Sequence, residues 1–162
     1  MPSPTARPGA PAGIDPRGPR VGAGLTALLL VVVLLLTALE SVWPSVVVLA
    51  LVVVSFAIGT ARGPQGTWQG AFFKRFVRPR LSPPTDLEDP RPPTFAQLVG
   101  LIITGVGLVL GLLAASGLVP GLAVAVTVSA ALALVAAFLN SVFGLCLGCE
   151  MYLLGQRLRA RA

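Results

Sequence analysis

Only 11% of the 162 residues are charged and 55% are hydrophobic, which excludes an ordinary water-soluble enzyme because soluble domains carry about 25% charged residues. The chain has no His and two Cys, so it cannot build a Ser-His-Asp triad, a His metal site, or a zinc or iron–sulfur centre within one chain. The net charge of +6 comes from basic residues that flank apolar segments, a pattern typical of contact with anionic lipid rather than nucleic acid.

The first part of the chain predicts a tail and a helical hairpin. Residues 1–20 are rich in Pro and Gly and lack an apolar pattern, so we expect a disordered tail. Apolar runs follow at about 21–39 and 45–61, each near the roughly 20 residues that cross a bilayer as a helix. Trp43 and Pro44 between them predict a tight turn at the membrane interface. The first run is longer than the roughly 7–15 apolar residues of a signal peptide, so we expect it to stay in the protein.

A long polar connection from 62 to 94 contains an amphipathic segment at about 67–77. Apolar residues recur there at helical spacing, and basic residues take the other positions. This pattern predicts an amphipathic helix that lies in the cytoplasmic membrane interface. The apolar set is Trp68, Phe72, Phe73, Phe76 and Val77, and the basic set is Lys74, Arg75 and Arg78.

The last part predicts a second hairpin, with spans at about 95–118 and 122–143 on either side of a turn at Pro120. No charged residue lies within the spans, so Thr104 and Asn140 are the main polar side chains expected inside the bundle. Small residues recur at four-residue spacing on both spans, which predicts that these two helices form the tightest pair. They are Gly107, Gly111 and Ala115 on one span, and Ala125, Ser129, Ala133, Ala137 and Ser141 on the other.

The predicted fold is an all-α integral membrane bundle of four transmembrane helices, made of two related hairpins, with cytoplasmic interfacial amphipathic helices. The membrane domain covers 21–158, and a basic tail covers 159–162. All 12 Lys and Arg residues lie in the two tails or the middle connection, and none lies in the two short turns. The positive-inside rule then places both termini and the middle connection in the cytoplasm, as in a multi-pass protein of the bacterial plasma membrane.

The same short motif precedes each hairpin. The sequence Asp-Pro-Arg occurs at 15–17, before the first span, and again at 89–91, before the third. An Asp caps free N–H groups at a helix start, and Pro suits a first turn. We therefore interpret the chain as two repeats in parallel orientation, related by a pseudo-two-fold axis along the membrane normal.

The segment 144–156 carries the one group of residues suited to chemistry. Cys146 and Cys149 form a C-x-x-C motif, whose candidate binding surroundings are Asn140, Gly148, Glu150 and Tyr152. Three interpretations stay open: a pair active in redox or sulfur transfer, two cysteines that only pack in the interior, and a metal site shared between two chains. We expect no metal site within a single chain.

The course of the helix around this pair decides its thiol chemistry. A fourth span that continued through Glu150 would place both cysteines near a helix C-terminus beside a carboxylate, which disfavours a thiolate. A break at Gly144 would start a new helix near Cys146, whose N-terminal N–H groups favour a thiolate. In either case we expect the thiols at the membrane surface, within reach of a cytosolic partner.

The Asp-Pro-Arg lead-in, the four spans and the sequence from Phe143 to Tyr152 resemble the bacterial membrane family catalogued as domain of unknown function 4395. The resemblance covers about 14–159. Members of that family often occur beside thioredoxin-like and sulfurtransferase genes, so the resemblance implies a role in thiol or sulfur metabolism. Its most specific matches are Cys146, Gly148, Cys149 and Tyr152.

These observations predict a membrane component of thiol redox or sulfur relay, in which Cys146 attacks and Cys149 resolves the intermediate. The expected partners are the lipid bilayer and a cytosolic thioredoxin-like or sulfurtransferase protein, with no nucleic acid and no cofactor. A homo-oligomer is compatible with the sequence, and we do not expect a stand-alone enzyme. Two alternatives remain. A small transporter or channel for a sulfur compound would need a polar path near Thr104 and Asn140, and a scaffold would have no catalytic role.

Overall fold

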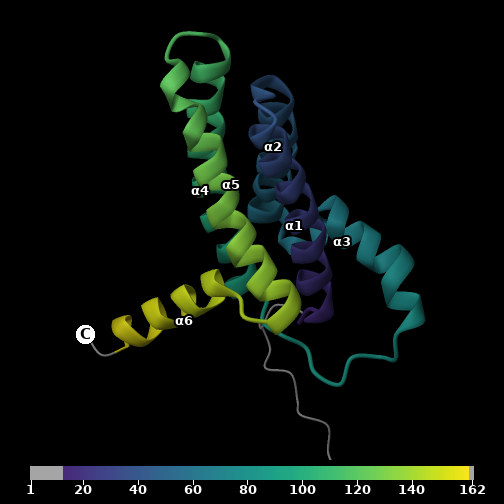
Figure 1. The fold of residues 1–162 in the computed structure, drawn as a ribbon. Coiled ribbons are helices and arrows are strands. Elements are labelled where there is room, and N and C mark those ends of the chain that lie inside the picture. Colours follow the sequence, from purple (N-terminus) through teal and green to yellow (C-terminus); the bar gives the residue numbers. More distant parts are fainter. Residues whose placement is uncertain (1–12, 161–162) are drawn as a thin grey trace, which may run out of the picture.

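The computed structural model describes residues 13–160, which form six α-helices and several short helical turns (Figure 1). Four helical segments are long and apolar enough to cross a membrane, and this confirms the predicted all-α membrane bundle. Most of the expected N-terminal tail, residues 1–12, and residues 161–162 lie outside the described residues. The helices are α1 (Arg17–Ala38), α2 (Val42–Arg62), α3 (Trp68–Phe72), α4 (Arg91–Ala115), α5 (Val124–Phe138) and α6 (Leu147–Arg159).

The first three spans begin earlier than their apolar runs predict. Helix α2 begins at Val42 and not at 45, so Trp43 and Pro44 lie in its first turn and the prediction that they form the tight turn is wrong. Helix α1 begins at Arg17, so residues 17–20 are helical and do not belong to a tail. Helix α4 begins at Arg91, although the apolar run begins at Phe95. In both cases the Asp-Pro-Arg motif starts the helix, because a carboxylate oxygen of Asp15 or Asp89 accepts the backbone N–H of the Arg two residues later, at 3.1 and 2.9 Å. Capping groups can start a helix in polar sequence, which an apolar pattern does not show.

The four spanning segments form a ring in which α1 packs on α2 and α5, and α4 packs on α5 and α2. Helices α1 and α4 therefore lie diagonally across the bundle. The small residues of α4 and α5 do meet, since Gly107 lies against Ser129 and Gly111 against Val126. Over its full length from Pro120 to Phe143, the fourth span packs on α4 about as extensively as α2 does, so the prediction that the second hairpin is the tightest pair stays a prediction. Gly111 also lies against Val46 of α2, which shows that small residues of one helix serve two neighbours.

The two halves of the chain have the same order of elements: an Asp-Pro-Arg motif, a hairpin and a helix that leaves the bundle. Ile14 and Glu88, each directly before its Asp, form an antiparallel bridge in which both N–H···O bonds are 2.9 Å long. A bridge between equivalent residues is the contact that a two-fold axis between the halves would produce. Figure 1 shows α3 and α6 leaving the same end of the bundle toward opposite sides.

Charged groups fasten the middle connection to the start of α1. The buried Asp15 carboxylate pairs with Arg17 at 2.9 Å and with Arg78 at 3.4 Å. Arg17 also donates a hydrogen bond to the carbonyl oxygen of Ser82. The hydrogen bond from the Arg17 side chain is the main cause that holds the pKa of Asp15 below its usual value. The first motif therefore anchors the connection as well as capping a helix.

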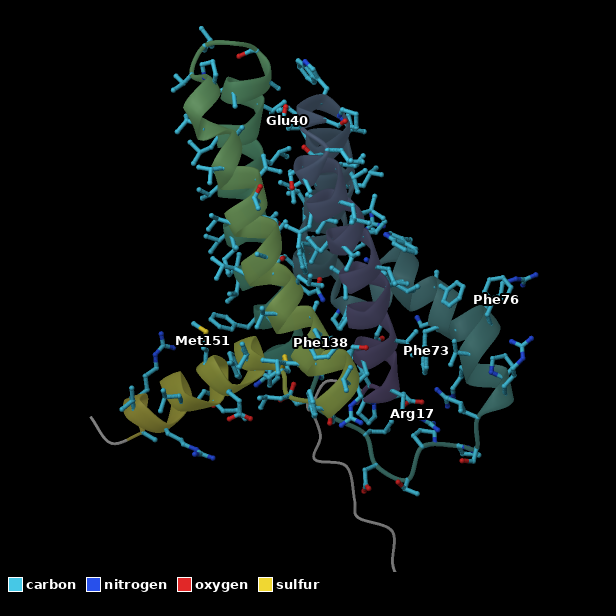
Figure 2. All side chains as sticks on the ribbon, in the orientation of Figure 1. Arg17, Glu40, Phe73, Phe76, Phe138 and Met151 are labelled. Atoms are coloured by element: carbon cyan, nitrogen blue, oxygen red, sulfur yellow. A yellow bond between two sulfur atoms is a disulfide. The ribbon has the colours of Figure 1, made fainter. Side chains whose placement is uncertain are left out.

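Helix α3 continues through a π-helical turn (Phe73–Val77) and a 3-10 turn (Arg78–Arg80). Phe73 is buried and packs against Gly18 of α1, while Phe76 points to the outer side (Figure 2). Trp68 and Phe72 are also exposed. Trp68 also donates its indole N–H to the Ser55 hydroxyl of α2 at 2.7 Å. The expected apolar face is therefore divided, because Trp68 and Phe73 attach the segment to the bundle while Phe72 and Phe76 are free to meet lipid.

Candidate functional site

The backbone breaks just before the cysteine pair. A π-helical turn (Leu139–Phe143) ends α5, Gly144 adopts φ 69°, and α6 begins after Cys146. Of the two courses considered from the sequence, the structure has the break at Gly144. Glycine suits this left-handed conformation, and the guanidinium of Arg20 fills the space that a Cβ at Gly144 would need.

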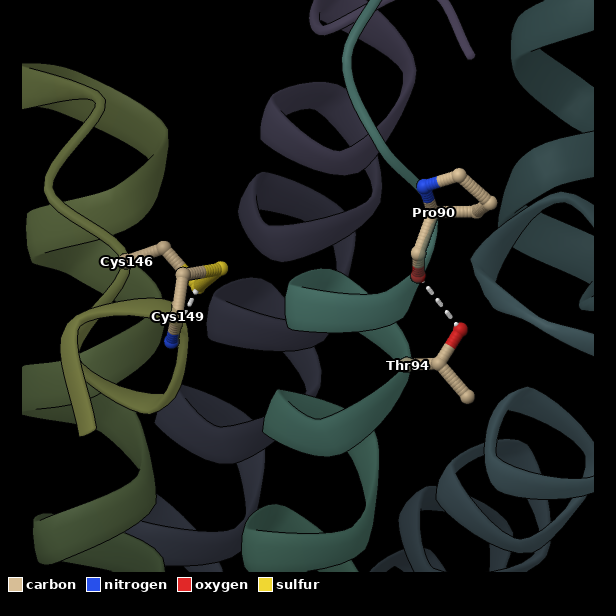
Figure 3. Close-up of a disulfide and its surroundings, with 4 residues drawn as sticks. All are labelled: Pro90, Thr94, Cys146 and Cys149. Carbon is tan, nitrogen blue, oxygen red and sulfur yellow. Dashed lines mark hydrogen bonds between the residues drawn. A yellow bond between two sulfur atoms is a disulfide. The ribbon is translucent and has the colours of Figure 1, made fainter. Parts of the chain in front are cut away.

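Cys146 and Cys149 are joined in a disulfide across the first turn of α6, with their Cα atoms 5.2 Å apart. Cys146 is the N-cap residue, and its Sγ accepts the backbone N–H of Cys149 at 3.3 Å. Both residues are half-buried. The disulfide faces the first turn of α4, where Thr94 donates its hydroxyl to the Pro90 carbonyl (Figure 3).

Gly148 allows α6 to pack directly against α4. A Cβ at this position would lie 2.6 Å from both the Cα and the Cβ of Ala96, so only glycine allows the two backbones to approach this closely. One turn further along, the ring of Tyr152 lies 5.7 Å from that of Phe95 of α4, centroid to centroid. The Tyr152 hydroxyl accepts a hydrogen bond from Gln156 at 2.8 Å. These contacts fix the start of α6, and therefore the disulfide, against the bundle.

An outer pocket of about 300 Å³ opens beside the disulfide. It brings together four of the six residues predicted from the sequence, namely Asn140, Cys146, Cys149 and Glu150. Arg20, Glu88 and Asp89 also line it, so both signs of charge are present next to the sulfur atoms. Gly148 lies on the other side of the α6 backbone, and Tyr152 lines neither this pocket nor the inner cavity.

An inner cavity of about 320 Å³ lies on the opposite side of Cys146, between α1, α4 and α5. Most of its lining is apolar, and its polar side chains include Thr26, Gln69 and Gln97. Cys146 and Asn140 line both hollows. The disulfide therefore stands between a charged pocket and an apolar cavity.

The cysteine pair has a structural counterpart in the first repeat. Thr67 is the N-cap of α3, and its hydroxyl accepts the backbone N–H of Gly70 at 3.1 Å. This is the bond that Cys146 makes with Cys149 in α6. Thr67 and Cys146 both line the inner cavity. The second repeat therefore carries a disulfide where the first carries an ordinary hydroxyl cap.

Sequence reasoning missed Arg20, Asp89 and Gln69 as parts of the site. Arg20 and Asp89 belong to the segments that start the two hairpins, and only the fold brings these segments beside α6. For Gln69, the alignment of α3 with α6 was the available signal, because it places the residue directly before Gly70 in the counterpart of the C-x-x-C motif. Within 13–160, no three His, Cys, Asp or Glu side chains come close enough to hold a metal ion.

Comparison with known proteins identifies a family but no characterised relative. No curated protein and no solved structure matches the chain. A family model described as Domain of unknown function (DUF4395) matches residues 14–157, which run from the Ile14 bridge through all of α6 except its last two residues. The chain belongs to this family.

Proposed function

We propose that the protein is a membrane component of thiol redox or sulfur relay that acts through Cys146 and Cys149. The observation that carries the proposal is the disulfide at the N-terminus of α6, half-buried and lining a charged pocket. Cysteines that only fill a core are more deeply buried and are not paired across a helix start. This geometry suits a pair that opens and closes.

The helix start distinguishes the two sulfur atoms. When the pair is reduced, a thiolate at Cys146 would accept the N–H of Cys149 and lie at the positive end of the α6 dipole, and both effects favour the thiolate. Arg20, which lines the same pocket, adds a positive charge, while Glu150 and Asp89 oppose it. We assign the attacking role to Cys146 and the resolving role to Cys149.

With a partner that carries a disulfide, the exchange has two steps. The Cys146 thiolate attacks one partner sulfur, a mixed disulfide forms, and the other partner sulfur leaves as a thiolate. Cys149 loses its proton and attacks Cys146, which restores the intramolecular disulfide and releases the second partner thiolate. Two electrons pass to the partner, and the reverse sequence reduces the protein. With a persulfide partner, the outer sulfur is transferred to Cys146 in the first step.

The proposed partner is a thioredoxin-like or sulfurtransferase protein on the cytoplasmic side of a bacterial plasma membrane. The charge distribution supports this side, because Lys and Arg within 13–160 lie at the end of the bundle that carries α3 and α6. The opposite end, with the two hairpin turns, carries Glu40 (Figure 2). A surface rich in Lys and Arg is typical of the cytoplasmic face.

Trapping of a mixed disulfide tests the proposal. The variant Cys149→Ala should accumulate a covalent complex with a cytosolic thiol protein, visible on non-reducing gels and lost on reduction, because no resolving thiol remains. Cys146→Ala should form at least about 10-fold less of this complex, since the attacking thiolate is gone. The double variant is the control for non-specific capture. Equal trapping by the two single variants, or none by either, would refute the proposed roles.

The transport alternative finds no supporting observation in the described residues. Thr104 is fully buried, and its hydroxyl donates to the Gly100 carbonyl at 2.7 Å, so this side chain offers no free polar group to a passing solute. Asn140 lies at the end of the span beside the disulfide.

A further inference from the structure

The inner cavity lies between the two repeats. It is lined by matching positions of the diagonal helices, Pro19 with Pro93 and Gly22 with Ala96, counted from each Asp-Pro-Arg motif. The N-cap residues of α3 and α6 also reach it. The cavity exists because α1 and α4 do not pack on each other at this level, and the two halves differ in what they present to it.

One side of the cavity presents a buried amide whose hydrogen bonding is incomplete. Gln69 is 5% exposed, and its Nε2 donates to the Thr26 hydroxyl at 3.3 Å. Its Oε1 is buried and has no hydrogen-bond partner. Gln69 lines the cavity, and buried polar groups in proteins are nearly always paired, so the unpaired oxygen of this side chain points to a ligand that supplies the missing partner when the amide turns toward it.

The other side presents the redox-active sulfur. Cys146 lines the cavity together with Gly148, whose missing side chain leaves the α6 backbone close to α4. Leu132 also lines the cavity while 57% of its side chain is exposed on the surface of the spanning helices. An apolar molecule dissolved in the bilayer could therefore approach between the helices and meet both the amide and the disulfide.

We propose that the cavity binds the ring of a membrane quinone, which exchanges two electrons with the cysteine pair. This inference rests on the proposed thiol function and names its second substrate. In the oxidising direction, the Cys146 and Cys149 thiols lose two electrons and two protons and form the disulfide. The quinone takes up the same two electrons and two protons and becomes the quinol, so the step needs no further oxidant.

The chemistry of Gln69 favours a quinone over an acyl chain. A primary amide offers an acceptor and a donor that exchange places when the side chain turns over. Oε1 would accept the hydroxyl of a quinol, and after rotation Nε2 would donate to the carbonyl of a quinone, while the other atom meets the Thr26 hydroxyl. An acyl chain would leave the amide unpaired. A mostly apolar cavity of about 320 Å³ lies within the range of small-molecule sites and has room for a ring system.

Binding can be measured without any thiol chemistry. In a protein with Cys146→Ala, Cys149→Ala and Trp43→Phe, the remaining Trp68 lies next to Gln69, and a bound quinone should quench its fluorescence. We expect saturable quenching by menadione in detergent, and an apparent Kd at least about 10-fold higher when Gln69→Leu removes the amide. Gln65→Leu is the matched control, because this Gln is exposed on the preceding turn and lines neither hollow.

A second variant helps to distinguish a loss of quinone binding from misfolding. Gln69→Asn keeps an amide on a side chain that is one methylene shorter, so the amide lies farther from the ligand and binding should also weaken. Circular dichroism and thermal unfolding show whether each variant is folded. Unsaturable quenching, or equal affinity for the wild-type, Gln69→Leu and Gln69→Asn proteins, would overturn the proposed site.

Electron transfer is measured on the full chain with both cysteines present. The reduced protein, freed of reductant and mixed anaerobically with menadione, should lose two thiols for each quinol formed. Gln69→Leu should slow this reaction about 10-fold at subsaturating quinone, whereas the control Gln65→Leu should not slow it. Trapping without quinone reduction would refute this inference alone, whereas quinone binding without trapping would refute the proposed partner exchange alone.

Discussion

Single residues decide how closely the backbones approach around the disulfide. Gly144 turns the chain through a conformation that side chains rarely adopt, and Gly148 lets α6 touch α4. Neither residue contributes a functional group. Their role is to hold Cys146 at the N-terminus of α6, where it lines both the outer pocket and the inner cavity.

Gly148→Ala should destabilise the protein by about 1–3 kcal/mol, because the new Cβ would overlap the backbone of Ala96 and push α6 away from α4. The thermal unfolding midpoint in detergent measures this effect. Gly155→Ala is the matched control in the same helix, since nothing lies within 4 Å of a Cβ there. That control should be neutral or slightly stabilising because alanine favours helix. A Gly148→Ala protein as stable as the control would contradict the close packing of α6.

At the scale of elements, the residues at each helix start determine where α1 and α4 begin, and the apolar runs that follow do not. The two Asp-Pro-Arg motifs begin α1 and α4 with the same hydrogen bond. They differ in their surroundings, because Asp15 is buried and paired with two arginines whereas Asp89 is exposed. The first motif therefore also anchors the connection that carries α3.

Asp15→Asn should lower the unfolding midpoint at pH 7 by about 2–4 °C, since it keeps a capping oxygen but removes the charge that Arg17 and Arg78 face. The pKa of Asp15 is lower in the folded protein than its usual value. Its stabilisation is therefore complete above the unfolded pKa, near pH 4, and is lost as the pH falls through the folded value.

Thermal unfolding of Asp15→Asn and wild-type protein between pH 7 and pH 3 measures this dependence, and the two midpoints should converge below about pH 4. Asp89→Asn is the control, because this carboxylate caps a helix but has no arginine pair among the described residues. A gap between the wild-type and Asp15→Asn midpoints that stays constant across the pH range would show that the charge of Asp15 is not its source.

The exposed aromatic rings of the α3 segment predict contact with lipid. In a Trp43→Phe protein reconstituted into vesicles, brominated lipids should quench Trp68, and bromine near the headgroups should quench more than bromine near the chain ends. The double substitution Phe72→Asp and Phe76→Asp should reduce this quenching, because it places charge on exposed apolar positions. Unchanged quenching by both lipids in the double variant would argue against an interfacial position of α3.

At the scale of the whole molecule, the two repeats place their helix-starting motifs and their outgoing helices at the same end. Both Asp-Pro-Arg motifs, α3, α6 and the disulfide lie at this end, and the hairpin turns lie at the other (Figure 1). A parallel repeat produces this arrangement directly, because each repeat begins and ends on the same side of the membrane.

The orientation can be tested with single cysteines in a Cys146→Ala, Cys149→Ala background. Ser82→Cys lies in the middle connection and Ser116→Cys in the second hairpin turn, and both positions are exposed. In intact cells a membrane-impermeant maleimide should label Ser116→Cys at least about 10-fold more than Ser82→Cys, as the positive-inside rule requires. Both should react equally once the membrane is opened. Preferential labelling of Ser82→Cys in intact cells would reverse the proposed orientation.

The sequence by itself determined the number and class of the helices, because about 20 consecutive apolar residues must form a helix to satisfy their backbone hydrogen bonds in lipid. It also indicated the repeat and offered the break at Gly144 as one of two courses. It could not decide which helix faces pack together, since residues that meet lipid and residues that meet protein are equally apolar. Tertiary structure decided that α4 packs on both α2 and α5, that Phe73 faces α1, and that Gln69 and Cys146 line one cavity. The physical reason is that these features arise from contacts between the two repeats, which no local pattern in either repeat records.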